Sequence, residues 1–244
     1  MSLEPHGEPM LEEFAANTLL MLLCYGYVLV VIFMSSRIEK LFDISRKSSR
    51  KFLHAMIGNL PFVIPFFTIG FFPFFVAAPF VLVTILASPY TPFKGVRGKL
   101  KGLSEISSEG HPLGLVFYAI SYSVLALFSA SRAYVVAAGV LPMAYGDSLA
   151  SLVGERYGRR KYRLMANKSL EGSLAMFLGS FLSFFLSLFF FSAFYQFSLA
   201  AQVVPAIAVA LIATVAEGLS PMGFDNLAVP VLSVLAFLFS GGGL

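Results

Sequence analysis

One acidic residue, Asp147, stands in an apolar stretch of the chain with no apparent partner, and it is the first candidate for chemistry. A charged side chain inside a membrane helix costs about 2.5–3.5 kcal/mol, so such residues are usually functional or paired. A carboxylate is a ligand that Mg²⁺ accepts, often together with phosphates. We therefore expect Asp147 to bind a divalent cation. The alternative is helix packing, because Gly146, Ala150 and Gly154 have a spacing that lets helices approach closely.

The segment GERYGRRKYRLMANKSLEGS follows and carries six basic residues, enough to offset a polyanion. Gly158 and Gly172 permit close backbone approach, and Ser169 is placed to cap the next helix, whose N-terminus favours phosphate. The alternative is an anchor on lipid headgroups. The flanking carboxylates of Asp147 and Glu171 favour a metal-bound nucleotide as the ligand.

A third cluster, RKSSRKFLHAMIG, brings Arg50, Lys51 and His54 to the start of an apolar segment. Arg50 and His54 are four residues apart, so they share one face of a helix. The cluster is compatible with phosphate binding or with a headgroup anchor that includes an interfacial histidine.

A fourth cluster, EGLSPMGFDNLAVP, contains the oxygen-bearing residues Glu217, Asp225 and Asn226. Its glycines and prolines predict a turn. Taken alone this is an acidic loop, but beside the basic segments it would complete a metal site.

The composition indicates an integral membrane protein that holds these clusters on helices. Hydrophobic residues make up 58% of the chain, charged residues 12%, and the mean hydropathy is +0.83. A soluble domain has about 25% charged residues, and a membrane helix needs about 20 apolar residues. We predict an all-α bundle of seven or eight transmembrane helices in one domain, residues 17–240, after an N-terminus, residues 1–16, that is disordered or extramembrane. The eight candidate spans are 17–34, 52–67, 71–86, 113–128, 133–153, 173–194, 203–216 and 227–240.

The basic residues predict the orientation of this bundle. Of the 17 lysines and arginines, all except Arg132 fall in three alternate loops, within residues 37–51, 94–101 and 156–168. Such a bias places these loops on the cytoplasmic side. The loop 217–226 then faces the cytoplasm as well, so every charged cluster lies at one face of the membrane. The basic residues are explained by topology and contact with membrane lipids, and we predict no nucleic-acid partner. The acidic N-terminus does not resemble a signal peptide, which leaves a prokaryotic plasma membrane and the endoplasmic reticulum both open.

Four segments resemble motifs of the superfamily of dolichol kinases, phytol kinases and CTP-dependent diacylglycerol kinases. They are RKFLHAMIG, GDSLASLVGERYGRRKY, NKSLEGSLAMF and GFDNLAVP, in family order across about residues 50–230. CDP-diacylglycerol synthases are related and share two of these elements. Their closing motif has a second acidic residue where this chain has Asn226, which favours a kinase over a cytidylyltransferase.

The resemblance implies transfer of the γ-phosphoryl group of CTP to a lipid alcohol, with Mg²⁺. It implies three groups of site residues: Asp147 and Asp225 as metal ligands supported by Asn226 and Glu217; Arg160, Lys161, Asn167, Lys168 and Ser169 around the triphosphate; and Arg50, Lys51 and His54 on phosphate or the acceptor hydroxyl. His54 or a carboxylate would accept the proton of that hydroxyl.

The compact chain favours a polyprenol, dolichol or phytol-like alcohol as the acceptor, and the motif NKSL favours diacylglycerol. A lipid-phosphate cytidylyltransferase is a further alternative. A different class, an ion-coupled transporter, would spread ionisable residues through the bilayer. Here they gather at one face, which counts against transport.

Overall fold

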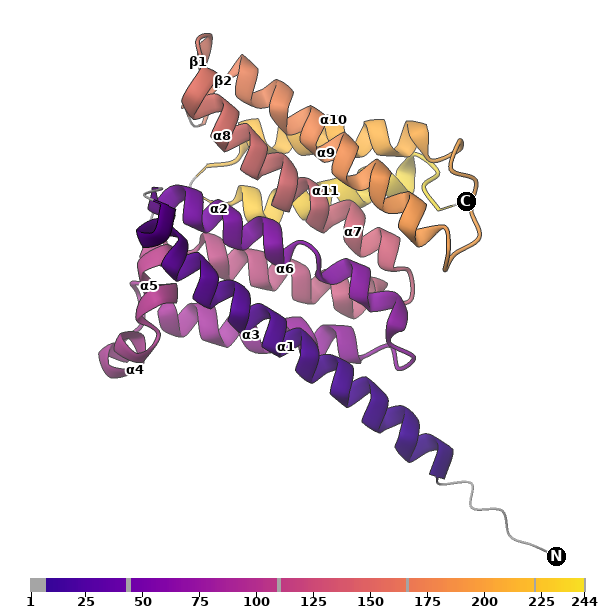
Figure 1. The fold of residues 1–244 in the computed structure, drawn as a ribbon. Coiled ribbons are helices and arrows are strands. Elements are labelled where there is room, and N and C mark those ends of the chain that lie inside the picture. Colours follow the sequence, from indigo (N-terminus) through magenta and orange to yellow (C-terminus); the bar gives the residue numbers. More distant parts are fainter. Residues whose placement is uncertain (1–7, 43–44, 109–110, 166, 222, 244) are drawn as a thin grey trace, which may run out of the picture.

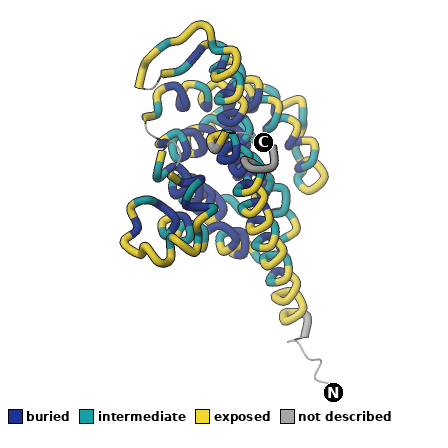
Figure 2. Tube along the Cα trace, turned by 60° about the vertical axis from the view of Figure 1, so that its left-hand side comes forward, coloured by how far each residue is buried: buried dark blue, intermediate teal, exposed yellow. Residues whose placement is uncertain are grey.

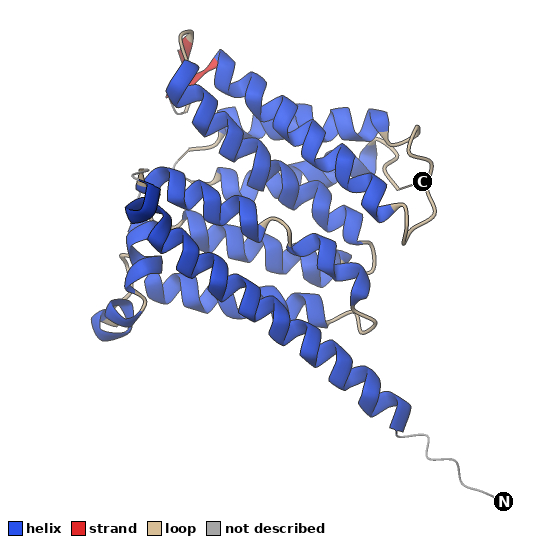
Figure 3. Cartoon of the chain, viewed as in Figure 1, coloured by secondary structure: helices blue, strands red, loops and turns tan. Residues whose placement is uncertain are grey.

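The computed structural model describes residues 8–42, 45–108, 111–165, 167–221 and 223–243, which form a bundle of helices with one short β-hairpin (Figure 3). The predicted all-α class is confirmed. The elements are α1 (Glu8–Phe42), α2 (Arg46–Ile57), η1 (Leu60–Phe66), α3 (Phe72–Ala87), α4 (Lys94–Lys99), α5 (Lys101–Ser108), α6 (Gly114–Ser129), α7 (Ala133–Leu141), η2 (Pro142–Gly146), α8 (Asp147–Tyr157), β1 (Lys161–Arg163), β2 (Asn167–Ser169), α9 (Leu170–Phe191), α10 (Val203–Leu219) and α11 (Asp225–Phe239).

Three helical segments among the described residues are long and apolar enough to cross a membrane: Met10–Ile38, Ala133–Tyr157 and Leu170–Phe191. Helices α3, α6, α10 and α11 are apolar but shorter. Each of the eight predicted spans overlaps a helical segment, and the number of seven or eight crossings stays a prediction. This is a membrane protein, and its α1 already begins at Glu8, inside the stretch expected to be disordered or extramembrane.

The second predicted span, residues 52–67, is not one continuous α-helix. α2 ends at Ile57, and the 3₁₀ helix η1 follows with Pro61 at its start and Pro65 inside it. Proline lacks the N–H group that continues an α-helix and its ring clashes with the preceding turn. Because the break ends α2 at Ile57, the polar residues of this short helix lie near one end of the bundle and are not part of a continuous membrane-spanning helix.

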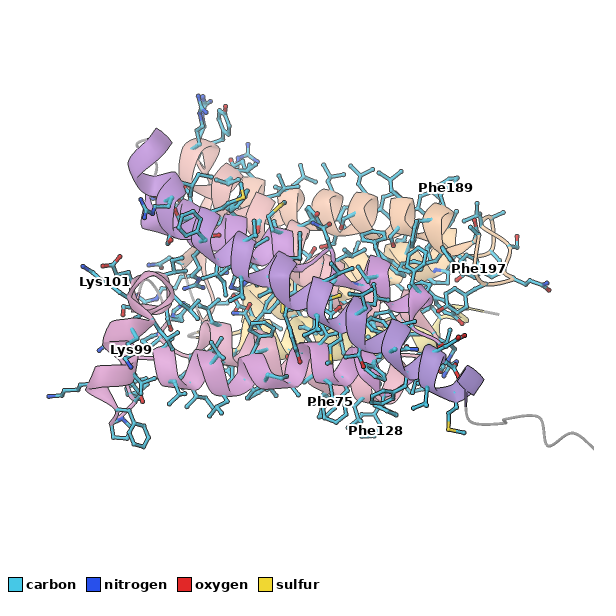
Figure 4. All side chains as sticks on the ribbon, turned by 60° about the horizontal axis from the view of Figure 1, so that its bottom comes forward. Phe75, Lys99, Lys101, Phe128, Phe189 and Phe197 are labelled. Atoms are coloured by element: carbon cyan, nitrogen blue, oxygen red, sulfur yellow. The ribbon has the colours of Figure 1, made fainter. Side chains whose placement is uncertain are left out.

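The charged loops all lie at one end of the bundle, as the distribution of basic residues predicts. Figure 1 shows α4, α5, the start of α2, the β1–β2 hairpin and the start of α11 at this end, with the start of α1 and the end of α11 at the other. Lys99 and Lys101 project from the first end in Figure 4, away from Phe189 and Phe197. The cytoplasmic assignment of this end stays a prediction.

Helix α7 is the centre of the bundle. All of its residues are buried, and the buried segments gather in the interior in Figure 2. Its small residues make this possible: a Cβ atom at Gly139 would lie 2.9 Å from the carbonyl oxygen of Pro230 in α11. The outer surface is apolar instead, with Phe128 77% and Leu19 61% exposed. An apolar exterior around a buried centre is the arrangement that a lipid environment favours.

The glycines around Asp147 bring α8 and α9 into close contact. A Cβ atom at Gly146 would lie 2.9 Å from the sulfur of Met176, and one at Gly179 would lie 3.2 Å from the Cα of Gly146. One turn further, a Cβ at Gly172 would lie 3.1 Å from the carbonyl oxygen of Ala150. The predicted small-residue packing face is therefore confirmed, and it faces α9.

Candidate functional site

Asp147 lies where a π-helical turn passes into α8. Its N–H group donates to the carbonyl oxygen of Pro142, five residues earlier, in place of the usual four. Such turns occur often at functional sites because they re-aim side chains. The Asp147 side chain is buried and accepts a hydrogen bond from the Nζ of Lys51 in α2. The residue with no apparent partner in the sequence is thus half of a buried ion pair.

Helix α2 contributes a buried polar face to the same region. The Ser45 hydroxyl caps its N-terminus by accepting from the N–H of Ser48 at 3.2 Å. Arg50, Lys51 and His54 are all buried, the last only 1% exposed. Arg50 and His54 therefore share the inward face, as their spacing predicts. All three side chains are buried, so they do not lie at the surface where a lipid-headgroup anchor would be.

His54 is held by α6. Its ring packs against that of Tyr118 with the centroids 4.6 Å apart, and the Tyr118 hydroxyl donates to the carbonyl oxygen of His54 at 3.1 Å. Both ring nitrogens of His54 are buried and have no hydrogen-bond partner among the residues that the structure describes. A buried nitrogen without a partner is costly, so a polar group of a ligand would stabilise it.

A second ion pair joins the hairpin to α10. Strands β1 and β2 pair antiparallel with Tyr162 opposite Lys168, so these two side chains point to the same face. The Lys168 ammonium donates to Oε1 of Glu217, which is buried. Burial by itself would lower the pKa of Lys168, but the adjacent Glu217 carboxylate outweighs burial and the pKa is raised above its ordinary value. Lys168 therefore stays positively charged inside the cluster.

The turn between α10 and α11 brings Asp225 and Asn226 to this end. The backbone and side-chain amides of Asn226 donate to Oδ1 of Asp225 at 2.9 and 3.2 Å, and the Ser121 hydroxyl of α6 donates to the carbonyl oxygen of Asn226 at 2.7 Å. The turn needs Gly223, which has a φ of 82°, a conformation that side chains with a Cβ rarely adopt.

Gly114, the first residue of α6, lets three elements meet. A Cβ atom there would lie 3.3 Å from Nδ2 of Asn226 and 3.5 Å from Nη2 of Arg50. Arg50 of α2 and Asn226 of α11 thus approach the same backbone point. A larger residue at position 114 would push the two polar side chains apart.

The four clusters of the sequence therefore converge in part. Asp147, Glu217 and Asp225 lie within electrostatic range of one another, and Lys168 lies within range of all three. Lys51 pairs with Asp147 and also lies within range of Asp225. Residues from four distant segments thus form one mixed cluster of carboxylates and cations, which we call the charged cluster: Arg50, Lys51, Asp147, Lys168, Glu217, Asp225 and Asn226.

Several predicted phosphate ligands lie outside the charged cluster. The side chains of Arg160, Lys161 and Asn167 are exposed on the hairpin and the loop before it. The hydroxyl of Ser169 accepts from the N–H of Gly172 at 3.1 Å, so the predicted cap of the helix is confirmed. The Glu171 carboxylate accepts from the backbone N–H groups of residues 159 and 160, both at 3.2 Å, so it fastens the hairpin rather than joining Asp147.

The oxygen atoms predicted to bind a metal do not form a closed protein cage. Within the described residues, no three His, Cys, Asp or Glu side chains gather closely enough to hold a metal ion. Two buried acceptor atoms, Oε2 of Glu217 and Oδ1 of Asn226, nevertheless have no hydrogen-bond partner in the described part of the chain. Mg²⁺ usually takes one or two carboxylates and completes its shell with phosphate and water, and the charged cluster fits that open kind of site.

Comparison with known proteins points to one enzyme class. A phytol kinase of Synechocystis is 39% identical over 141 residues, which cover 56% of this chain and 59% of that protein. Probable phytol kinase 1 of Oryza sativa is 30% identical over 142 residues, covering 55% of this chain and 45% of that protein. This chain is similar to phytol kinases. Probable phytol kinase 2 of Oryza sativa is 27% identical over 220 residues, covering 86% of this chain and 71% of that protein.

The similarity to phytol kinases is partial. The matched part of the chain spans about half the length of the first two relatives. No protein-family profile matches the chain, and no solved structure matches it. The predicted relations to dolichol kinases and to CDP-diacylglycerol synthases stay predictions.

Sequence reasoning missed Tyr118 and Gly114, which position His54, Arg50 and Asn226 in this phytol-kinase-like chain. Tyr118 stands in an apolar run, where a tyrosine is expected to be a core residue. Its hydroxyl donates to the carbonyl oxygen of His54, which is 64 residues away. Gly114 follows a proline and a leucine, a pattern that predicts the start of a helix. Neither carries a local signal, because each acts through an element distant in the sequence.

Proposed function

We propose that this protein transfers the γ-phosphoryl group of CTP to the hydroxyl of a membrane lipid alcohol of the phytol or polyprenol class, with Mg²⁺ as cofactor. The observation that carries the proposal is the charged cluster itself, in which carboxylates and cations from four segments meet at one end of an apolar bundle. The similarity to phytol kinases supports an alcohol acceptor. The motif resemblance supports CTP as the donor.

Asp147 and Asp225 would hold Mg²⁺, with the orphaned oxygens of Glu217 and Asn226 in support. When bound, Mg²⁺ neutralises charge on the phosphate oxygens of the nucleotide. Asp225 lies within electrostatic range of Asp147 although 78 positions separate them, and two carboxylates within such range repel each other. A bound cation would offset that repulsion, which supports both residues as its ligands.

Lys51, Lys168 and Arg50 would hold the triphosphate. Phosphoryl transfer requires mainly positioning and charge stabilisation. In the structure, Lys51 and Lys168 donate to carboxylates. If the carboxylates bind Mg²⁺, the two ammonium groups would be available to phosphate oxygens, which accept charge-assisted hydrogen bonds well. The exposed side chains of Arg160, Lys161 and Asn167 would contact the outer part of the nucleotide. Ser169 is buried and caps α9, whose N-terminus would favour phosphate.

His54 would orient the acceptor hydroxyl and take its proton. Neither ring nitrogen has a hydrogen-bond partner within the described ranges, and the ring packs against Tyr118. The hydroxyl oxygen forms a bond to the γ-phosphorus as the bond from that phosphorus to the β–γ bridging oxygen breaks. CDP leaves, and the proton passes to an imidazole nitrogen.

The decisive experiment offers γ-labelled CTP and γ-labelled ATP to the purified protein with phytol, a polyprenol or diacylglycerol, with and without Mg²⁺. We expect a labelled phytyl or polyprenyl monophosphate from CTP and none after chelation of Mg²⁺. Label transferred from ATP alone would overturn the assignment of CTP as the donor. Labelled phosphatidic acid as the sole product would overturn the assignment of a phytol-like or polyprenol-like acceptor. Cytidine found on a lipid phosphate would mean a cytidylyltransferase, and ion-coupled flux in vesicles without any labelled lipid would mean a transporter.

Lys168→Met should lower kcat/KM for CTP by about 100-fold, because it removes a buried charge that meets the phosphates. The matched control is Arg163→Met in the same hairpin. The Arg163 side chain is exposed, so this substitution should change kcat/KM for CTP by less than about threefold. Steady-state assays at varied CTP measure both.

The effect of losing the ion pair between Lys168 and Glu217 must be separated from the effect of losing a group that binds phosphate. Lys168→Met leaves the buried Glu217 carboxylate alone, which destabilises the chain. Adding Glu217→Gln removes that orphan charge. Wild-type kinetics in the Lys168→Met/Glu217→Gln double variant would show that Lys168 is only a structural partner and holds no phosphate.

A further inference from the structure

An apolar cavity of about 50 Å³ lies between α1, α2, η1, α3, α5 and α6. Its surface is made of carbon atoms throughout, although a threonine and two tyrosines are among its lining residues. The Thr84 hydroxyl turns away to donate to the carbonyl oxygen of Phe80 at 2.7 Å, and the Tyr118 hydroxyl donates to His54. A cavity without polar partners does not retain ordered water, and apolar ligands fill such spaces.

The cavity shares a wall with the charged cluster. Leu53 of α2 lines the cavity, and the next residue is His54. Leu115 of α6 lines it as well, next to Gly114, where Arg50 and Asn226 approach. Tyr118 lines the cavity, and its ring also packs against that of His54. The apolar space is therefore bordered by the same side chain that contacts the His54 ring.

The cavity is elongated along the helices. Its lining residues on α6 run from Leu115 to Tyr122, two turns or about 10 Å at 1.5 Å per residue. On α3 they run from Thr84 to Val76, a similar distance. Leu115 and Thr84 are nearest the end of the bundle with the charged cluster, so Val76 and Ala77 of α3 lie at the deep end.

We infer that this cavity holds the hydrocarbon chain of the lipid alcohol, with the hydroxyl emerging past Tyr118 toward His54. The inference rests on the proposed function and adds the location of the acceptor's apolar part. The volume is about a third of the roughly 150 Å³ apolar cavity known to bind benzene, so it holds the stretch of chain nearest the hydroxyl and the rest extends outside. Filling the empty space restores dispersion contacts that the lining atoms lack.

The test fills the deep end. Ala77→Leu should raise KM for phytol at least tenfold and leave KM for CTP unchanged. The matched control is Ala78→Leu on the same helix, which does not line the cavity and should leave KM for phytol unchanged. If Ala77→Leu does not fold, Val76→Leu adds one methylene group at the same end and should raise KM for phytol at least threefold.

Binding of tritiated phytol to the purified protein separates this inference from the proposed function. A wild-type protein that phosphorylates phytol while Ala77→Leu and Val76→Leu change neither KM nor binding would overturn the inference and leave the kinase assignment standing. A protein that binds phytol in a manner sensitive to Ala77→Leu, yet phosphorylates no alcohol, would overturn the kinase assignment and support the cavity.

Discussion

Asp147→Asn is expected to lower the rate of lipid-alcohol phosphorylation by at least about 10³-fold while the chain stays folded and inserted in the membrane. The substitution preserves the size of the side chain but removes the negative charge that would hold Mg²⁺. The remaining amide oxygen still accepts a hydrogen bond from Lys51. The loss of stability should therefore stay below the roughly 3–5 kcal/mol that breaking a buried ion pair outright costs.

The chain offers a matched control for this experiment. Lys47 of α2 and Glu155 of α8 also form an ion pair, on the same two helices as Lys51 and Asp147, but their side chains are 54% and 46% exposed. Glu155→Gln should change activity less than twofold and stability by less than about 1 kcal/mol. Initial rates and thermal unfolding in detergent measure both variants. Full activity in Asp147→Asn would remove Asp147 from the reaction, and equal losses in both variants would point to the α2–α8 contact instead.

Asp225→Asn is expected to lower kcat at least about 100-fold and to raise the Mg²⁺ concentration for half-maximal rate at least about tenfold. Asp225 and Asp147 interact electrostatically, so they would share one ion. Residues that act as a unit lose their effect together. The double variant Asp147→Asn/Asp225→Asn should therefore be no more than about threefold slower than the slower single variant. Mg²⁺ titrations of the four proteins measure this.

Additive losses in the double variant would contradict a shared metal site. So would an Asp225→Asn protein whose rate falls while its Mg²⁺ dependence stays that of wild type, because the carboxylate would then act on something other than the ion. The control is Ser220→Ala, the residue after α10, whose hydroxyl donates to the carbonyl oxygen of Ala216. It should keep the wild-type Mg²⁺ dependence.

The sequence determined the class of the fold and the end of the bundle where chemistry can occur. Apolar runs of helical length require helices, because backbone polar groups must be satisfied within each segment in lipid. The confinement of basic residues to alternate loops predicts that they meet at one end, and α2, α5 and the hairpin do so. The spacing of Gly146, Ala150 and Gly154 predicts a face on which helices approach closely, and the structure places α9 against that face.

Only the tertiary structure decided which side chains in that end touch. Lys51 and Asp147 lie 96 positions apart, and Lys168 and Glu217 lie 49 apart. Composition and local spacing carry no information about pairing over such separations. The β1–β2 hairpin places Lys168 in the charged cluster and leaves Lys161 exposed. Lys168 lies opposite Tyr162, and because successive residues of a strand face opposite sides, Lys161 points to the other face.

Pro61 and Pro65 break the second span locally, but the effect of this break on the site is visible only in the tertiary structure. By ending α2 at Ile57 it keeps His54 within one turn of the helix end, against Tyr118 of α6. The sequence thus identified the acidic and basic residues that are proposed to bind metal and phosphate. Helix packing decided which of them meet, because each contact depends on the distance between helices that no single segment encodes.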